Sequence, residues 1–381
     1  MPSAPPPPRS VDVSSIVSRE ALEQAVRRIA GPDAALLDAR PLAADRGGTE
    51  LKQAGYGEPL LLRYRAQGGE REAVFRTMKP NWFGHDRRAD RANLAILAAD
   101  TYASMPRHVQ TLDMGALRGP GEIVSLGGAG EFYLITSYAA GALYAQDLRA
   151  IEERGSATLL DAARAHALCQ YLVELHAERP AVEPEAYARA ARDLLGSGEG
   201  IFGIVDSYPE GGPVPRARLE AIERRCLAWR HRLRGRGKER RLRRTHGDFH
   251  PYNLLFRDGV DFTVLDASRG GVGDPADDVA ALAINYFFGG VVEPSSWARG
   301  MKPLWDAFWT TYLDATGDTE LLEVLAPFLA WRALVLASPV WYPGVRPEGR
   351  DAILALAEAA LDAPSFDPAL ADRYVSNAAA G

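Results

Sequence analysis

The sequence has few of the residues that form disulfide frameworks, thiolate metal sites or membrane spans. Cys169 and Cys226 are the only cysteines among 381 residues, and two thiols make neither a disulfide framework nor a zinc site. No run of about 18 apolar residues occurs in the sequence, so we expect no transmembrane helix. The opening segment, MPSAPPPPRSVDVSS, lacks the apolar core of a signal peptide. These absences favour a reducing compartment, and we expect a cytoplasmic protein.

Lysine is also scarce, and the charge balance argues against one large class of partners. Only four of the 44 basic residues are lysines, and the formal net charge is −6, which gives no general attraction to nucleic acid. Residues 230–244 are strongly basic, but no aromatic side chains interleave with the arginines. We expect this segment to be a solvated helix face rather than a nucleic-acid patch. We therefore expect neither nucleic-acid nor membrane partners, and the sequence favours no particular oligomeric state.

The first third of the chain has the composition of a small β-rich lobe. Residues 1–14 are rich in proline, and we expect them to form a disordered tail. In residues 15–137 the apolar spacing predicts two helices and several short strands. The predicted helices are 15–30 and 86–105, and the predicted strands are 36–44, 60–66, 72–79, 122–127 and 131–139. We expect a mostly antiparallel sheet with the helix at 86–105 laid across it.

The remainder of the chain, residues 138–381, has mainly helical spacing. A long helix is expected at 156–179, and the segments NLLF and FTVLD are expected to pair as a short hairpin. Further helices are predicted at 275–288, 299–315, 319–340 and 349–362. The sequence therefore predicts an α+β protein with two lobes, a small β-rich N-lobe at 15–137 and a larger helical C-lobe at 138–381.

The segment Thr245–Asp278 carries the most specific chemical signal. His246, Asp248 and Asn253 stand in an H-x-D-x-x-x-x-N spacing, and Asp266 follows Asn253 by thirteen residues. One carboxylate can orient an acceptor hydroxyl, while an amide oxygen and a second carboxylate can hold Mg²⁺. Phosphoryl transfer from a nucleotide in a kinase-type fold needs those groups. The spacing predicts Asp248 as the catalytic residue and Asn253 and Asp266 as metal ligands.

Each residue of this segment also has a purely structural interpretation. An aspartate in a loop usually forms a turn or caps a helix, and Asp266 could simply end a strand. However, the match is followed by NLLF, then V-L-D and then G-D-P-A-D-D at 273–278. This conjunction is far more specific than any single residue, and it favours the catalytic interpretation.

HGDFHPYNLLF resembles the catalytic loop of the aminoglycoside phosphotransferase-like (choline kinase-type) family, and VLDASRGGVGDPADDVA resembles its metal-binding segment. The resemblance implies a bilobal protein-kinase-like fold. It also implies that Asp278 braces the catalytic loop, which His246 supports. The sequence departs from the commoner family pattern after Asp266, where it continues Ala267-Ser268-Arg269.

The N-lobe should supply a cation that grips the nucleotide phosphates and a helix acid that pairs with this cation. Arg76 ends AVFR, which resembles the V-A-I-K segment of the fold, and Lys79 lies three residues further on. We favour Arg76 by strand alignment and keep Lys79 as the alternative. Asp90 is our candidate for the helix acid, in competition with Asp86 and Asp100.

Two further segments are candidates for nucleotide contacts. Residues 136–139, which include Ser137 and Tyr138, have the place of an inter-lobe hinge whose backbone would bind a purine. GGTELKQAGYG at 47–57 has the place of a phosphate-covering loop, but it does not match G-x-G-x-x-G. An ordinary strand-to-helix link and a plain flexible turn are the respective alternatives.

These features together predict a Mg²⁺-dependent kinase that moves the γ-phosphate of ATP or GTP to a hydroxyl of a small molecule. Only six residues separate Asp266 from Gly273, which leaves no room for the peptide-docking loop of a protein kinase. We expect an antibiotic acceptor of the aminoglycoside or nucleoside type, in self-resistance. The alternatives are a sugar, an amino alcohol or another primary metabolite as acceptor and, in a different class, a non-catalytic nucleotide-binding pseudokinase.

Overall fold

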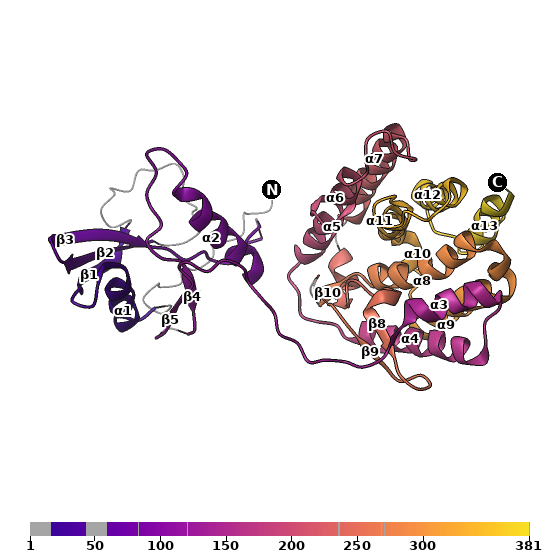
Figure 1. Ribbon diagram of the computed structural model, residues 1–381, viewed down its shortest axis with the longest axis horizontal. Coiled ribbons are helices and arrows are strands. Elements are labelled where there is room, and N and C mark those ends of the chain that lie inside the picture. Colours follow the sequence, from indigo (N-terminus) through magenta and orange to yellow (C-terminus); the bar gives the residue numbers. More distant parts are fainter. Residues whose placement is uncertain are drawn as a thin grey trace. The chain divides into compact units, whose positions relative to one another are not determined.

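The computed structural model describes residues 17–42, 59–82, 84–119, 121–234, 237–267, 269 and 271–380. The chain divides into two compact units, Met1–Thr136 and Ser137–Gly381, which are coloured indigo to purple and magenta to yellow in Figure 1. The predicted tail at 1–14 and the predicted phosphate-covering loop at 47–57 lie outside the described residues.

A three-stranded antiparallel sheet with the order β1-β2-β3 forms the centre of the first unit. The strands are β1 (Ala35–Pro41), β2 (Leu60–Ala66) and β3 (Gly69–Phe75). Ala66 pairs with Gly69, so β2 and β3 form a hairpin with a two-residue turn, and Gly68 in that turn has a φ of 93°. A separate two-stranded sheet pairs β4 (Gly115–Leu117) with β5 (Ile123–Ser125).

Two predictions for the first unit are wrong. Residues 131–139 form no strand, and β5 pairs with β4 instead. The helix that covers the sheet is α1 (Arg19–Ala30), whose Ala21, Leu22 and Val26 are buried against it. The predicted helix at 86–105 exists as α2 (Arg88–Tyr102) but has no buried residue. Most apolar residues of α2 are alanines, which offer little surface to bury.

The second unit is a helical assembly with two small sheets. Its helices are α3 (Tyr144–Arg154), α4 (Leu159–Ala177), α5 (Ala186–Gly196), α6 (Ile201–Asp206), α7 (Arg216–Leu233), α8 (Pro275–Val292), α9 (Lys302–Thr316), α10 (Leu321–Val324), α11 (Ala326–Ala337), α12 (Pro347–Asp362) and α13 (Leu370–Ala380). The helix predicted at 319–340 is therefore two helices, and Pro327 stands in the first turn of α11, where proline is tolerated because no backbone donor is needed. The predicted α+β class is confirmed.

Helix α8 lies at the centre of this unit and contacts α3, α9, α11, α12 and α13 (Figure 1). Its sequence is apolar on nearly every side after the first turn, and its side chains are almost all buried. A helix that is apolar all round is stable only inside a core. The first turn of α8 is therefore held at a fixed place, and this turn carries the polar residues described below.

Short strands position the segment that contains the predicted site. β6 (Ala142–Leu143), β8 (Leu254–Phe256) and β9 (Phe262–Val264) form one small antiparallel sheet, and β7 (Arg243–Arg244) pairs with β10 (Val272–Gly273). The predicted hairpin of NLLF and FTVLD is thus the β8–β9 pair. Among the described residues, no helix has the length and apolar character needed to cross a membrane.

Candidate active site

The loop between β7 and β8 contains the predicted catalytic residues. Pairing of β7 with β10 brings the start of this loop next to the start of α8, because β10 leads directly into that helix. Gly247 has a φ of 83°, a conformation that glycine adopts without strain. The buried Phe249 stacks on Tyr171 of α4, with ring centroids 5.5 Å apart. The loop is thus anchored on both sides of Asp248.

Asp278, in the first turn of α8, holds the loop backbone. Its Oδ2 accepts a hydrogen bond from the backbone N–H of His246 at 2.7 Å, and its Oδ1 accepts one from Gly247 at 2.7 Å. His176 of α4 lies 3.2 Å from the same carboxylate and 2.7 Å from the hydroxyl of Tyr312. Because a carboxylate only accepts, Nε2 of His176 donates to Asp278 and Nδ1 accepts from Tyr312.

His246 links the loop to the strand that precedes Asp266. Its Nε2 lies 2.7 Å from the carbonyl oxygen of Leu265, and its Nδ1 lies 3.2 Å from the backbone N–H of Asp248. The carbonyl requires a donor and the N–H requires an acceptor, so Nε2 carries the proton. Placed in this way, His246 joins the loop and the strand before Asp266 by hydrogen bonds.

The side chain of Asp248 lies among three polar partners. Arg332 of α11 donates from Nη1 to Oδ1 of Asp248, and His250 lies 3.4 Å from Oδ2. The amide nitrogen of Asn253 donates to the backbone carbonyl of Asp248 at 3.0 Å and to Oδ2 at 3.3 Å. The Asp248 side chain nevertheless stays 20% exposed, so a substrate hydroxyl can reach it.

These partners fix the ionisation state of Asp248. Burial disfavours its charge, but the hydrogen bond from His250 and the charge of Arg332 outweigh this effect. The pKa of Asp248 therefore lies well below its usual value. An aspartate of this kind is a carboxylate at every physiological pH, so it can accept a hydrogen bond from a hydroxyl and orient it.

The β8–β9 hairpin brings Asn253 and Asp266 together. Leu254 pairs with Val264, and the N–H of Leu265 donates to the carbonyl oxygen of Asn253 at 2.8 Å. Asp266 is the next residue along the chain and has a φ of 53°. A left-handed conformation in a residue other than glycine is uncommon and gathers at functional sites.

The donors of the hairpin fit Mg²⁺. Because the amide nitrogen of Asn253 points to Asp248, its amide oxygen is left as an acceptor, and the carboxylate of Asp266 is the second oxygen donor. Mg²⁺ usually takes one or two protein groups and completes its octahedron with phosphate and water. Among the described residues no cluster of three or more His, Cys, Asp or Glu side chains could hold a metal.

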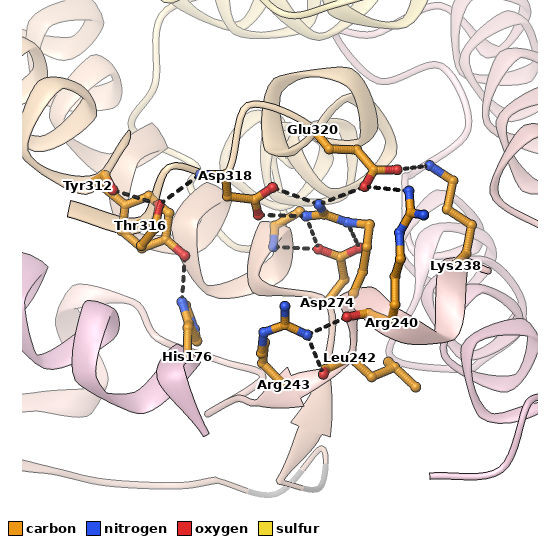
Figure 2. A network of polar contacts seen from close by, with 12 residues as sticks. His176, Lys238, Arg240, Leu242, Arg243, Asp274, Tyr312, Thr316, Asp318 and Glu320 are labelled. Atoms are coloured by element: carbon orange, nitrogen blue, oxygen red, sulfur yellow. Dashed lines mark hydrogen bonds and ion pairs between the residues drawn. The ribbon is translucent and has the colours of Figure 1, made fainter. Parts of the chain in front are cut away.

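A second polar network holds the start of α8 from another direction (Figure 2). Asp274 caps the helix by accepting from the N–H of Ala276 at 3.0 Å. Arg241 donates to both oxygens of Asp274, at 2.8 and 2.9 Å, and to Asp318 at 2.8 and 3.1 Å. Arg241 is only 5% exposed. The expectation of a solvated helix face at 230–244 is wrong at this residue, because α7 ends at Leu233 and Arg241 enters the core.

Sequence reasoning missed two residues of the site, Arg332 and Asp277. Arg332 donates from Nη2 to Oδ1 of Asp277 at 2.7 Å and to the carbonyl oxygen of Gly247 at 3.0 Å. A signal for Arg332 did exist, since it is an arginine inside an otherwise apolar helix, APFLAWRALVLA. A buried charge of this kind needs a carboxylate partner, but the sequence does not reveal which one.

The predicted nucleotide residues of the first unit lie in different local settings. Arg76 is exposed and follows the end of β3 by one residue, while Lys79 is partly buried in the segment that follows. Asp90 accepts from the backbone N–H of Arg87 at 2.9 Å and so belongs to the N-terminal cap of α2. Ser137 and Tyr138 stand at the junction of the two units. Their roles in nucleotide binding stay predictions.

Comparison with known families and proteins gives one extended match. The family model described as "Phosphotransferase enzyme family" matches residues 61–328. The matched range includes the whole segment from β7 to α8 and also Asp318. No curated protein sequence matches the chain.

Several solved structures are similar at low sequence identity. A glucosamine kinase (crystal form A) is 17% identical with a TM-score of 0.38, and the match covers 57% of each chain. A glucosamine kinase in complex with glucosamine, ADP and inorganic phosphate is 16% identical with a TM-score of 0.40, over 91% of this chain and 99% of that chain. A choline kinase from Cryptosporidium parvum Iowa II is 13% identical with a TM-score of 0.36, over 88% and 94%. Likeness at this level says nothing about the acceptor.

Proposed function

Because the chain belongs to the phosphotransferase enzyme family, as the resemblance of residues 245–278 predicted, we propose that it transfers the γ-phosphoryl group of ATP or GTP to a hydroxyl of a small molecule. The observation that carries the proposal is the grouping of Asp248, Asn253 and Asp266 by one short hairpin. The small acceptor is supported by the short segment between Asp266 and Gly273.

Asp248 would orient the acceptor hydroxyl toward the γ-phosphorus. The new bond joins the acceptor oxygen to that phosphorus, and the bond from the phosphorus to the bridging oxygen of the nucleoside diphosphate breaks. Because the pKa of Asp248 lies well below its usual value, the hydroxyl proton does not stay on this carboxylate and passes to solvent. Positioning and charge stabilisation then provide most of the rate.

Asn253 and Asp266 would hold Mg²⁺ through their side-chain oxygens. Bound Mg²⁺ would neutralise phosphate charge as the bond to the leaving group breaks. Arg76 or Lys79 of the first unit would bind the phosphates, and Asp90 would pair with that cation. The backbone at Ser137 and Tyr138 would contact the purine. His246 and Asp278 would keep the loop in the orientation that this chemistry needs.

The test is release of ADP or GDP over a panel of hydroxylated antibiotics, sugars and amino alcohols, with both nucleotides and with Mg²⁺ present or chelated. We expect acceptor- and Mg²⁺-dependent release that Asp248→Ala and Asp266→Ala abolish while leaving the circular dichroism spectrum unchanged. Turnover within a few-fold of wild type for either variant contradicts the assignment. Nucleotide binding without release for any acceptor would favour the non-catalytic alternative.

A further inference from the structure

The carboxylate of Asp248 is paired with a buried guanidinium group, that of Arg332. Arg332 is 7% exposed and donates to Asp248 through Nη1, to Asp277 through Nη2 at 2.7 Å and to the carbonyl oxygen of Gly247 at 3.0 Å. One guanidinium group therefore hydrogen-bonds both the predicted catalytic carboxylate of Asp248 and the carboxylate of Asp277. Neither carboxylate is left as an unpaired anion.

A second guanidinium group lies close to the same residues. The guanidinium carbon of Arg269 is 4.9 Å from the ring centroid of Trp331, the residue that precedes Arg332 on α11. Its charge also acts on Asp277, whose pKa is raised by burial and by the charge of Asp278, against the opposing charges of Arg332 and Arg269. The cationic groups near Asp248 and Asp277 are thus two guanidinium groups, and the further carboxylate, Asp278, already accepts from the backbone N–H groups of His246 and Gly247.

Aromatic side chains lie near the same carboxylate. Burial and then the neighbouring Tyr252 and Asp248 raise the pKa of Tyr342 to about 12, so the Tyr342 hydroxyl stays neutral within electrostatic reach of Asp248. Phe288 packs edge-on against Tyr342 with centroids 5.1 Å apart. Tyr252 is 49% exposed. These rings offer neutral, partly apolar surfaces to a molecule whose hydroxyl contacts Asp248.

We propose that the acceptor is an uncharged hydroxyl compound, and that Arg332 sets this preference by engaging both Asp248 and Asp277. This inference rests on the proposed function, since it assumes that the acceptor hydroxyl meets Asp248. A cationic acceptor would find both carboxylates already paired and would approach two guanidinium groups of like charge. An anionic acceptor would meet the carboxylate of Asp248 beside the nucleotide phosphates.

Matched acceptor pairs test the preference directly. The pairs are glucose with glucosamine and 3,3-dimethylbutan-1-ol with choline, which differ in charge at nearly constant shape, and glucuronate is the anionic counterpart of glucose. We expect at least tenfold higher kcat/KM for the uncharged member of any pair that turns over. A cationic or anionic member that is the better substrate overturns the proposal, while its turnover still supports the phosphotransferase function.

Calorimetry gives a test that needs no turnover. Gentamicin serves as the polycationic probe, added to the full chain with Mg²⁺ and a non-hydrolysable ATP analogue. We expect weak binding to the wild type and at least tenfold tighter binding to Arg332→Gln, because this change releases both carboxylates. Micromolar binding to the wild type that Asp248→Asn abolishes overturns the proposal, even if no acceptor is ever phosphorylated.

Arg241→Gln is the matched control for both tests. Arg241 is buried and bridges Asp274 and Asp318 in the same manner, but it makes no contact with Asp248. We expect this variant to lose stability without changing the ranking of charged and uncharged acceptors. Equal shifts in ranking for Arg241→Gln and Arg332→Gln would mean that the effect is only structural, and would overturn the role of Arg332. If Arg332→Gln does not fold, Arg332→Lys, which keeps one positive charge, should retain the wild-type ranking.

Discussion

Arg241 and Arg332 make the same kind of contact with different results for their carboxylate partners. Each is buried, and each joins one carboxylate at the start of α8 to a carboxylate from another part of the second unit. The Asp274 side chain, bound to Arg241, is 1% exposed, whereas that of Asp248, bound to Arg332, is 20% exposed. The same ion-pair chemistry therefore fixes a helix end in one place and orients a reactive group in the other.

The largest expected effect comes from exchanging the two carboxylates for their amides. We predict that Asp248→Asn lowers kcat by about 10²–10⁴-fold, the usual contribution of a positioned catalytic carboxylate, and also lowers the thermal midpoint because it weakens the ion pair with the buried Arg332. Asp274→Asn keeps a good helix-capping residue but weakens the bond to Arg241, so it should lower stability and leave kcat within tenfold. Steady-state kinetics and thermal melts on both variants check this, and the comparison fails if both lose activity equally.

The second largest effect that we predict is a loss of stability in the variant Arg241→Gln. Removing one partner of a buried ion pair typically costs about 3–5 kcal/mol, because the remaining carboxylates stay buried without compensation. Denaturant unfolding followed by tryptophan fluorescence measures this cost. A loss below 1 kcal/mol would show that Asp274 and Asp318 find other partners or water, and that the network contributes little to the fold.

The stability that Glu152 contributes should change with pH in the opposite direction to the stability that Asp248 contributes. Burial raises the pKa of Glu152 on α3 to about 7, against the charge of Arg149 and with that of Glu293. Because its pKa is raised in the folded state, the protonated form of Glu152 stabilises the fold. This contribution to the free energy of unfolding is lost as the pH rises through about 7. Glu152→Gln should therefore raise the thermal midpoint at pH 8 by about 2–4 °C and leave it nearly unchanged at pH 5.

The pKa of Asp248 is shifted in the opposite direction to that of Glu152. Its pKa is depressed, so its stabilising charge is present above the ordinary carboxyl pKa of about 3.9 and is lost only as the pH falls through the lower folded-state value. Melting curves from pH 5 to pH 8 should therefore contain no step that Asp248→Asn removes. A step in that range that disappears in Asp248→Asn would contradict the depressed pKa.

The smallest expected effect belongs to an arginine on the surface. Arg244 pairs with Glu178, and both side chains are well exposed, at 44% and 55%. Exposed ion pairs contribute little to stability because solvent screens them, so Arg244→Gln should leave the denaturant midpoint and the turnover nearly unchanged. Unfolding curves for Arg244→Gln and Arg241→Gln, measured together, separate burial from charge as the cause of the large effect.

The sequence predicts the local part of the site and misses the distant part. Asp248, Asn253 and Asp266 lie within one loop and hairpin, so their spacing and the apolar strand segments between them were enough to predict that they meet. Arg332 is 84 residues from Asp248, and their contact depends on how α11 packs against α8, which no local pattern encodes. The sequence therefore predicted the residues of the loop and hairpin but not Arg332, whose guanidinium group binds Asp248.

The same physical distinction explains the errors in the fold. Long segments rich in apolar residues, such as α4 and α8, were predicted as helices because their composition reflects burial directly. The strand predicted at 131–139 was inferred from apolar β-branched and aromatic residues, but a strand also needs a partner, and β5 pairs with β4 instead. The partner of a short strand is a tertiary property.

The first turn of α8 has a consequence for the order in which the molecule can fold. The catalytic loop is held by Asp278, which also binds His176 across 102 residues of sequence, and Asp248 is held by an arginine 84 residues later. During synthesis the loop therefore emerges well before the residues that orient it, and contacts of such long range form late. A chain that stops before α11 would contain the whole H-x-D-x-x-x-x-N segment and still lack an ordered Asp248.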